Sequence, residues 1–180
     1  MTVASSKFTK TTWEIAVFHI FYYCKVIEFQ EFINVGITLS KKTMIRYIEE
    51  LKNAGLLRVI YSKKENGYIH VDDSRHCPFL PPKYTQSERT NAHLDKLIRL
   101  VTIMLDAEYT EDPDWDEDEK PREDVFISWY KRTFQNVSRR TMYHDFEELN
   151  KIGYTIRYDD FDDYYSVDFP YCMEGLSLEK

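Results

Sequence analysis

The sequence predicts a mainly α chain with small β-hairpins, an α+β class, arranged as two similar units in tandem. Residues 40–55 and 138–153 align without a gap at an offset of 98, with seven identical positions and two Lys matched by Arg. Both segments have helical spacing, and two β-prone runs around a polar turn follow each. An internal match of this length indicates duplication.

Apolar spacing predicts a helix in each repeated segment. Apolar residues recur at i, i+4 and i+7, so they form one stripe along a helix. The stripe residues are Met44, Ile48 and Leu51 in the first segment and Met142, Phe146 and Leu149 in the second. Ser40 and Ser138 are placed to cap the N-termini, and Gly55 and Gly153 are placed to end the helices in a left-handed conformation.

The side of each helix opposite the stripe has cations in its N-terminal half. These outward residues are Lys42, Ile45, Arg46, Glu49 and Asn53 in the first helix and Arg140, Tyr143, His144, Glu147 and Lys151 in the second. The first hairpin surrounds Asn66-Gly67, a typical tight-turn pair. A basic-faced helix followed at once by a hairpin is the order of a winged helix-turn-helix, so we expect recognition helices at about 40–54 and 138–152.

In the first half, helices at 12–23 and 25–34 are expected before the recognition helix, and a hairpin at 57–72 after it. Thr12 is placed to cap the first of these helices. That helix is apolar on nearly all sides, so we expect it to be covered by the other domain or by a second protomer.

In the second half, helices at 91–107 and about 125–134 are expected before the recognition helix, and a hairpin after it. Three prolines and several small polar residues mark a linker between the halves. The predicted organisation is a first winged-helix domain at 1–73, a linker at 74–90, and a second winged-helix domain at 91–180 with an acidic insertion at 108–124.

The stretch S-R-R-T-M-Y-H-D-F-E-E-L-N-K-I-G-Y-T-I, residues 138–156, resembles the recognition helix and wing of DeoR-type winged helices, including those at the N-terminus of WYL-domain transcriptional regulators. The likeness covers roughly residues 93–169. The first copy resembles the family less closely, with Tyr47 where the second has Asp145. The resemblance implies DNA-binding domains. Because no WYL-like effector domain follows, a small-molecule inducer is not implied.

The net charge of −7 is unevenly distributed along the chain. Residues 108–124 sum to −8 and residues 159–180 to −6, so the remainder sums to +7. Screening limits the reach of a charge to about 8 to 10 Å at physiological salt. A local basic face can therefore bind DNA on an acidic protein, with a weaker long-range attraction.

The acidic insertion allows three interpretations. Its alternating carboxylates imitate the ligand order of a calcium loop and are Asp112, Asp114, Asp116, Asp118 and Glu123. Glu117 stands where such a loop has glycine, and two prolines stiffen the segment, so a solvated insertion is favoured. The third interpretation is that the insertion competes with phosphates for the protein's own basic face.

Enzymatic activity, cofactors and metal sites are not expected. No phosphate-cradling glycine loop and no nucleophile with a base is visible. His76-Cys77 lacks the partners of a zinc site, and His19 is expected to be a satisfied core residue. The cysteines, Cys24, Cys77 and Cys172, are too few for a disulfide framework. With no signal peptide and no apolar run that spans a bilayer, a cytoplasmic protein without membrane association is expected.

The leading hypothesis is a transcriptional regulator whose two recognition helices enter the major groove of double-stranded DNA. The expected DNA contacts are Ser40, Lys41, Lys42, Thr43, Ile45, Arg46, Lys63, Lys64, Ser138, Arg139, Arg140, Thr141, Tyr143, His144 and Lys151. A second copy of the chain is a further candidate partner, in a homodimer formed through the apolar first helix.

Two alternatives stay open. Acidic tandem winged-helix proteins also serve as protein-binding scaffolds, and the chain resembles the ScpB-like subunits of chromosome-segregation complexes in layout and charge. Outward Ile45 and the apolar first helix suit such contacts. A phage or plasmid replication initiator, also built from two winged helices, is the other alternative.

Overall fold

The computed structural model describes residues 8–24, 26–34, 36–37, 39–71, 80–106, 125–159 and 164–168. Its elements are, in chain order, α1 (Lys10–Tyr23), β1 (Val26–Glu28), α2 (Phe29–Asn34), α3 (Lys41–Asn53), β2 (Val59–Ser62), β3 (Gly67–His70), α4 (Glu88–Asp106), α5 (Val125–Thr133), α6 (Arg139–Asn150), β4 (Thr155–Asp159) and β5 (Tyr164–Asp168). The strands pair in antiparallel sheets of order β1-β3-β2 and β4-β5. Because helices predominate and the sheets are small, the mainly α, α+β class is confirmed.

The two repeated segments are helices with the expected ends. Ser40 and Ser138 each accept a hydrogen bond from the amide three residues later, at 3.2 and 3.1 Å. Both apolar stripes are buried. Gly55 and Gly153 follow the helices with φ of 78° and 103°, a region that favours glycine because it has no Cβ.

Residues 25–34 were predicted as one helix, but the described residues 26–34 form a short strand followed by a short helix. β1 pairs antiparallel with β3, with Ile27 opposite Tyr68. The β-branched pair Val26-Ile27 suits a strand, and Ile27 is fully buried there. A Cβ on Gly67 would lie 2.6 Å from the Ile27 carbonyl oxygen, so glycine at the hairpin turn also allows β1 to approach.

The N-terminus of α1 also differs from the prediction. Thr9, not Thr12, is the capping residue, and its hydroxyl accepts a hydrogen bond from the Thr12 amide at 3.1 Å. The Thr12 side chain is buried, and its hydroxyl donates to Glu148 Oε2 at 2.7 Å. Thr12 was mistaken for a cap because its partner lies 136 residues further along the chain.

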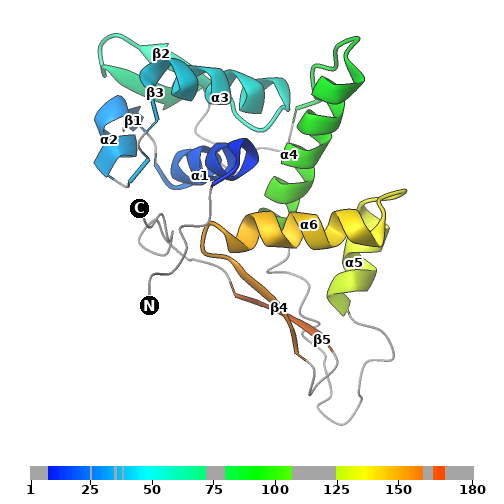
Figure 1. Ribbon diagram of the computed structural model, residues 1–180. Helices are drawn as coiled ribbons and strands as arrows, with labels where there is room; N and C mark the ends of the chain where they lie inside the picture. Colours follow the sequence, from blue (N-terminus) through cyan, green and yellow to red (C-terminus); the bar gives the residue numbers. More distant parts are fainter. Residues whose placement is uncertain are drawn as a thin grey trace.

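Other helices of the same chain cover α1 on nearly all sides. It packs against α3, α4 and α6, and Figure 1 shows it between α3 and α6. We expected either the other domain or a second protomer to cover this helix, and the structure shows helices of the other half of the chain, α4 and α6, packed on it. The apolar face proposed for a homodimer is therefore not exposed on α1. None of the described helices is both long and apolar enough to cross a membrane.

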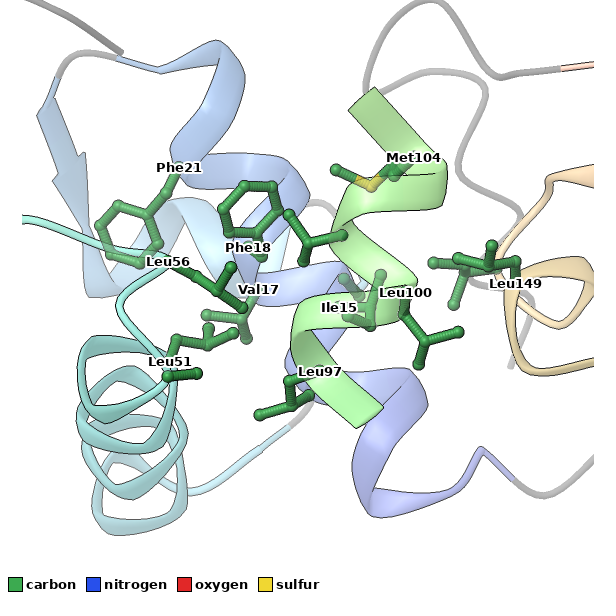
Figure 2. Packing of buried hydrophobic residues seen from close by; sticks show 14 of the residues in the cluster. Ile15, Val17, Phe18, Phe21, Leu51, Leu56, Leu97, Leu100, Met104 and Leu149 are labelled. Atoms are coloured by element: carbon green, nitrogen blue, oxygen red, sulfur yellow. The ribbon is translucent and has the colours of Figure 1, made fainter. Parts of the chain in front are cut away.

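One hydrophobic cluster runs through both halves. Figure 2 shows its members Val17 and Phe18 of α1, Leu51 of α3, Leu97 of α4 and Leu149 of α6. The predicted domain boundaries, which separate the two copies of the repeat, stay a prediction. In space, the repeated units share a continuous core.

The described part of the predicted linker lies against the C-terminal end of α3. The Leu80 amide donates to the Gly55 carbonyl oxygen at 3.0 Å, and the Lys83 amide donates to the Asn53 carbonyl oxygen at 2.7 Å. α4 then begins at Glu88, inside the range assigned to the linker. These contacts hold the chain on α3 before it enters the second half.

Several sequence predictions lie outside the described residues. They are the acidic insertion with its calcium and DNA-competition interpretations, the turn of the second hairpin, the chain after residue 168, and the His76-Cys77 pair.

Gly55→Ala is expected to lower the free energy of unfolding by about 2 kcal/mol or more. The φ of Gly55 is 78°, and a Cβ there would overlap the Leu80 carbonyl oxygen. Urea unfolding measures the effect. Gly55→Asn separates the two causes, because asparagine tolerates the left-handed region but still has a Cβ. If the Asn variant keeps wild-type stability, the close approach of the Leu80 carbonyl oxygen does not require glycine at position 55.

Candidate nucleic-acid interface

The predicted contact residues of the first half lie at the surface. Ser40, Lys41, Lys42, Ile45, Arg46, Lys63 and Lys64 are exposed, and Thr43 is half-buried. The Arg46 side chain is 60% exposed, and its guanidinium lies 5.3 Å from the centroid of the Tyr47 ring. Because Tyr47 is buried and contributes to the core, its ring supports the arginine from below.

The first hairpin and α3 form one concave surface. A groove of about 270 Å³ lies between α2, the N-terminal part of α3 and the hairpin; its lining includes Phe29, Lys41, Ile45, Tyr61 and Asn66. The Tyr61 hydroxyl donates to Asn66 Oδ1 at 3.0 Å at the turn. The structure thus brings two predicted helix contacts, Lys41 and Ile45, beside an aromatic hairpin residue.

The outer side of α6 carries most of the predicted contacts of the second half. Ser138, Arg139, Arg140 and His144 are exposed, and Thr141, Tyr143 and Lys151 are half-buried. Arg139 Nε donates to the Tyr143 hydroxyl at 2.8 Å, and His144 Nδ1 lies 3.1 Å from Glu147 Oε2. Lys151 is turned toward Glu148, at 3.4 Å, so it does not extend the outward row as expected.

The serine and threonine hydroxyls at the helix N-termini are already occupied. Ser40 Oγ lies 2.9 Å from Thr43 Oγ1, and Ser138 Oγ lies 2.8 Å from Thr141 Oγ1. The amides of the first two residues of a helix have no partner inside the helix. A phosphate at either end would therefore be held mainly by these amides and the adjacent cations.

The inner sides of α3 and α6 place equivalent carboxylates at the centre of the molecule. Glu50 and Glu148 occupy the same position of the repeat, at the offset of 98. Glu50 contacts Lys10 of α1 and His93 of α4, while Glu148 contacts Thr12 of α1 and residues of α4. We call this region, where both glutamates meet α1 and α4, the central interface.

On the α3 side of the central interface, two carboxylates share a histidine and a lysine as neighbours. His93 Nε2 lies 3.2 Å from Glu50 Oε2 and 2.9 Å from Glu14 Oε2. Lys10 Nζ forms an ion pair with Glu50 and lies 3.6 Å from Glu14. Burial raises the pKa of Glu14 to about 7, and the neighbouring Glu50 carboxyl acts in the same direction. Burial also acts to raise the pKa of Glu50, but the neighbouring Glu14 and Lys10 lower it.

On the α6 side, a single carboxylate is surrounded by donors. Glu148 Oε2 accepts from the hydroxyls of Thr9 and Thr12 at 2.6 and 2.7 Å, and Lys96 Nζ lies 3.4 Å from Oε1. Burial alone would raise the pKa of Glu148, but these hydrogen bonds and the cations Lys96 and Lys151 lower it. This glutamate is therefore ionised and fully satisfied.

One of the differences between the repeats, Tyr47 against Asp145, also has a structural role. Asp145 is 1% exposed. It accepts from Arg99 Nε and from the Tyr130 hydroxyl, both at 2.8 Å. Burial and the adjacent carboxylate raise the pKa of Tyr130. The second half thus uses a buried polar network where the first uses an aromatic ring.

Sequence reasoning missed the inward glutamates and Tyr61. Glu50 and Glu148 were visible as identical positions of the repeat. Their partners come from α1 and α4, which the repeat does not include.

No family model matches the chain, and neither the curated proteins nor the solved structures provide a match.

Glu148→Gln is expected to lower the free energy of unfolding at pH 7 by about 1 to 3 kcal/mol, because charge-assisted hydrogen bonds are lost. The pKa of Glu148 is lower in the folded chain than its ordinary 4.5, so its stabilisation is fully present above about pH 4.5 and is lost as the pH falls through the folded pKa. The difference between wild type and variant should therefore shrink from pH 6 to pH 3. Denaturant unfolding across this range measures it, and a constant difference would contradict the assignment.

Proposed function

We propose that each half of the chain is a winged helix-turn-helix and that the chain regulates transcription by binding double-stranded DNA through α3 and α6. The order of the first half supports this: a helix, a strand, two helices and a hairpin, with the strand paired to the hairpin. The second half has three helices and a hairpin. Both orders place a hairpin directly after the proposed recognition helix.

The main support is that the basic face of the repeated helix is exposed in both copies, α3 and α6. Both copies bury their apolar stripe and turn their second glutamate toward α1 and α4, and both leave the basic N-terminal turn at the surface. Lys41 and Lys42 in one copy correspond to Arg139 and Arg140 in the other. A buried or acid-covered face would have excluded a duplex, whereas exposed cations beside helix amides suit phosphates and guanine edges.

The two halves would contact DNA differently. In the first, Lys63 and Lys64 at the hairpin turn add phosphate contacts to those of the helix, and the groove lined by Ile45 and Tyr61 offers an apolar surface to a base edge. In the second, Arg140 is the principal candidate for reading guanine. The acidic sequence of the second hairpin makes it a poor phosphate contact.

Each recognition helix would need a groove of its own. α1 and α4 lie between α3 and α6 (Figures 1 and 2). The helices therefore cannot lie together in one groove, and an arrangement of two half-sites on one chain is the natural match, with successive grooves on one face of DNA about 34 Å apart.

A protein-interaction scaffold is the second candidate. The net charge of −7 disfavours long-range attraction to DNA, and α3 and the hairpin expose Ile45, Ile60 and Tyr61 at 42%, 53% and 47%. Salt-sensitive retardation of duplex DNA supports the regulator. No retardation at about 50 mM salt supports the scaffold.

Arg140→Ala is expected to weaken binding to a duplex selected from random DNA by about 1 to 3 kcal/mol and to relax preference at one base position. Gel retardation of wild type and variant on the same duplex measures the loss, and repeated selection measures the preference. Arg89→Ala is the matched control, because Arg89 is also exposed but lies on α4. Equal losses in both variants would mean that only net charge matters.

The double variant Lys63→Ala, Lys64→Ala is expected to weaken binding to all duplexes alike, because phosphate contacts carry no sequence information. The slope of log affinity against log salt should decrease by about 2, one for each lost phosphate contact. Lys83→Ala, a loss of charge at the exposed segment before α4, serves as control. An unchanged slope would remove the hairpin from the interface.

A further inference from the structure

Three metal-ligating side chains meet on the α3 side of the central interface. They are Glu14 of α1, Glu50 of α3 and His93 of α4, and one donor atom from each lies within 4.8 Å of the others. They come from three different helices and from both halves of the chain. The repeat does not include all of them, so duplication alone does not explain the group.

The hydrogen bonds of this group are incomplete. The Glu14 side chain is fully buried. His93 Nε2 hydrogen-bonds Glu14 Oε1 at 3.2 Å. The same nitrogen lies 2.9 Å from Glu14 Oε2, but this buried oxygen has no partner in hydrogen-bonding geometry. A buried carboxylate oxygen without a donor costs free energy, and a second carboxylate beside it adds repulsion when both are ionised. The Glu14 carboxylate therefore lies beside a second carboxylate, and the two share Lys10 and His93 as neighbours.

The spacing of the donor atoms suits a small tetrahedral cation. Bonds of about 2.0 to 2.1 Å at tetrahedral angles place ligand atoms about 3.3 Å apart. His93 Nε2 lies 3.2 Å from Glu50 Oε2 and 2.9 Å from Glu14 Oε2. Imidazole with two carboxylates is a ligand set for zinc and neighbouring transition metals, whereas calcium and magnesium prefer oxygen ligands alone.

Lys10 is the one competitor for this position among the described residues. Its ammonium forms an ion pair with Glu50 and lies 3.6 Å from Glu14. The Lys10 side chain is 44% exposed and belongs to the first turn of α1. It can therefore rotate into solvent without disturbing the core, which leaves the two carboxylates to a divalent cation.

We propose that Glu14, Glu50 and His93 form a binding site for a divalent transition metal, Zn²⁺ above all, which displaces Lys10 and joins α1, α3 and α4. Water completes the tetrahedron. The bound ion stabilises the association of the two halves and fixes α3, because its ligands come from both. This inference does not depend on DNA binding.

The repeat supplies an internal comparison. The equivalent glutamate, Glu148, contacts two threonine hydroxyls and lysines instead of an imidazole and a second carboxylate. Hydroxyl and ammonium groups are not the ligands that zinc selects in proteins. Glu148→Gln is therefore a matched control that alters the same kind of buried helix carboxylate and leaves the proposed site intact.

The experiment uses the full chain freed of metal with a chelator. Isothermal titration with Zn²⁺ is expected to give one ion per chain, and Zn²⁺ should raise the unfolding temperature. Co²⁺ should produce the intense visible absorption of a tetrahedral complex. Glu14→Gln and His93→Gln should each weaken binding at least about tenfold, and Glu148→Gln should leave it unchanged. Circular dichroism establishes that each variant is folded.

Lys10→Met gives a test in the opposite direction. Removing the competing ammonium should tighten Zn²⁺ binding, and this exposed position allows the variant to fold. If Lys10→Met binds no more tightly and the two ligand variants bind as well as wild type, the ion is held adventitiously by surface side chains. That result overturns the proposal, as does the absence of any binding to wild type.

Discussion

The structure depends on how the chain satisfies two equivalent, partly buried glutamates. Glu50 and Glu148 face inward from the repeated helices, and each needs cations or donors from helices outside its own repeat. α1 and α4 supply them from the middle of the molecule. A carboxylate that is largely removed from solvent without such partners is destabilising, so these polar contacts favour the orientation in which the inner sides of α3 and α6 face α1 and α4. The apolar stripes then complete one continuous core.

That constraint also determines what the surface offers. With the stripe and the second glutamate inward, the basic N-terminal turns of α3 and α6 face outward on either side of α1 and α4. The largely apolar α1 is covered within the chain by α3, α4 and α6. One chain thereby presents two similar exposed faces. Such an arrangement supports a protein that contacts two sites at once.

The two halves have diverged in how they hold their helices. The first adds β1 to its hairpin and uses Tyr47 beneath Arg46. The second replaces that ring with Asp145, bound to Arg99 and Tyr130. The central interface is uneven as well: Glu148 is fully satisfied, whereas Glu50 shares its neighbours with Glu14. The two repeated helices are therefore held by different contacts, and the less satisfied side is where we propose the metal ion.

The sequence by itself determined the repeated helices, their caps, their terminal glycines and their basic outer faces. Those features depend on spacing and on residues a few positions apart, which the chain displays directly. Only the tertiary structure decided that residues 26–28 form a strand, that Thr12 serves Glu148, and that α4 and α6 cover α1. Each of these depends on a partner far away in the chain. Local propensity cannot identify such a partner, because the strand gains its hydrogen bonds and the carboxylates their counter-charges only when distant helices and strands pack together.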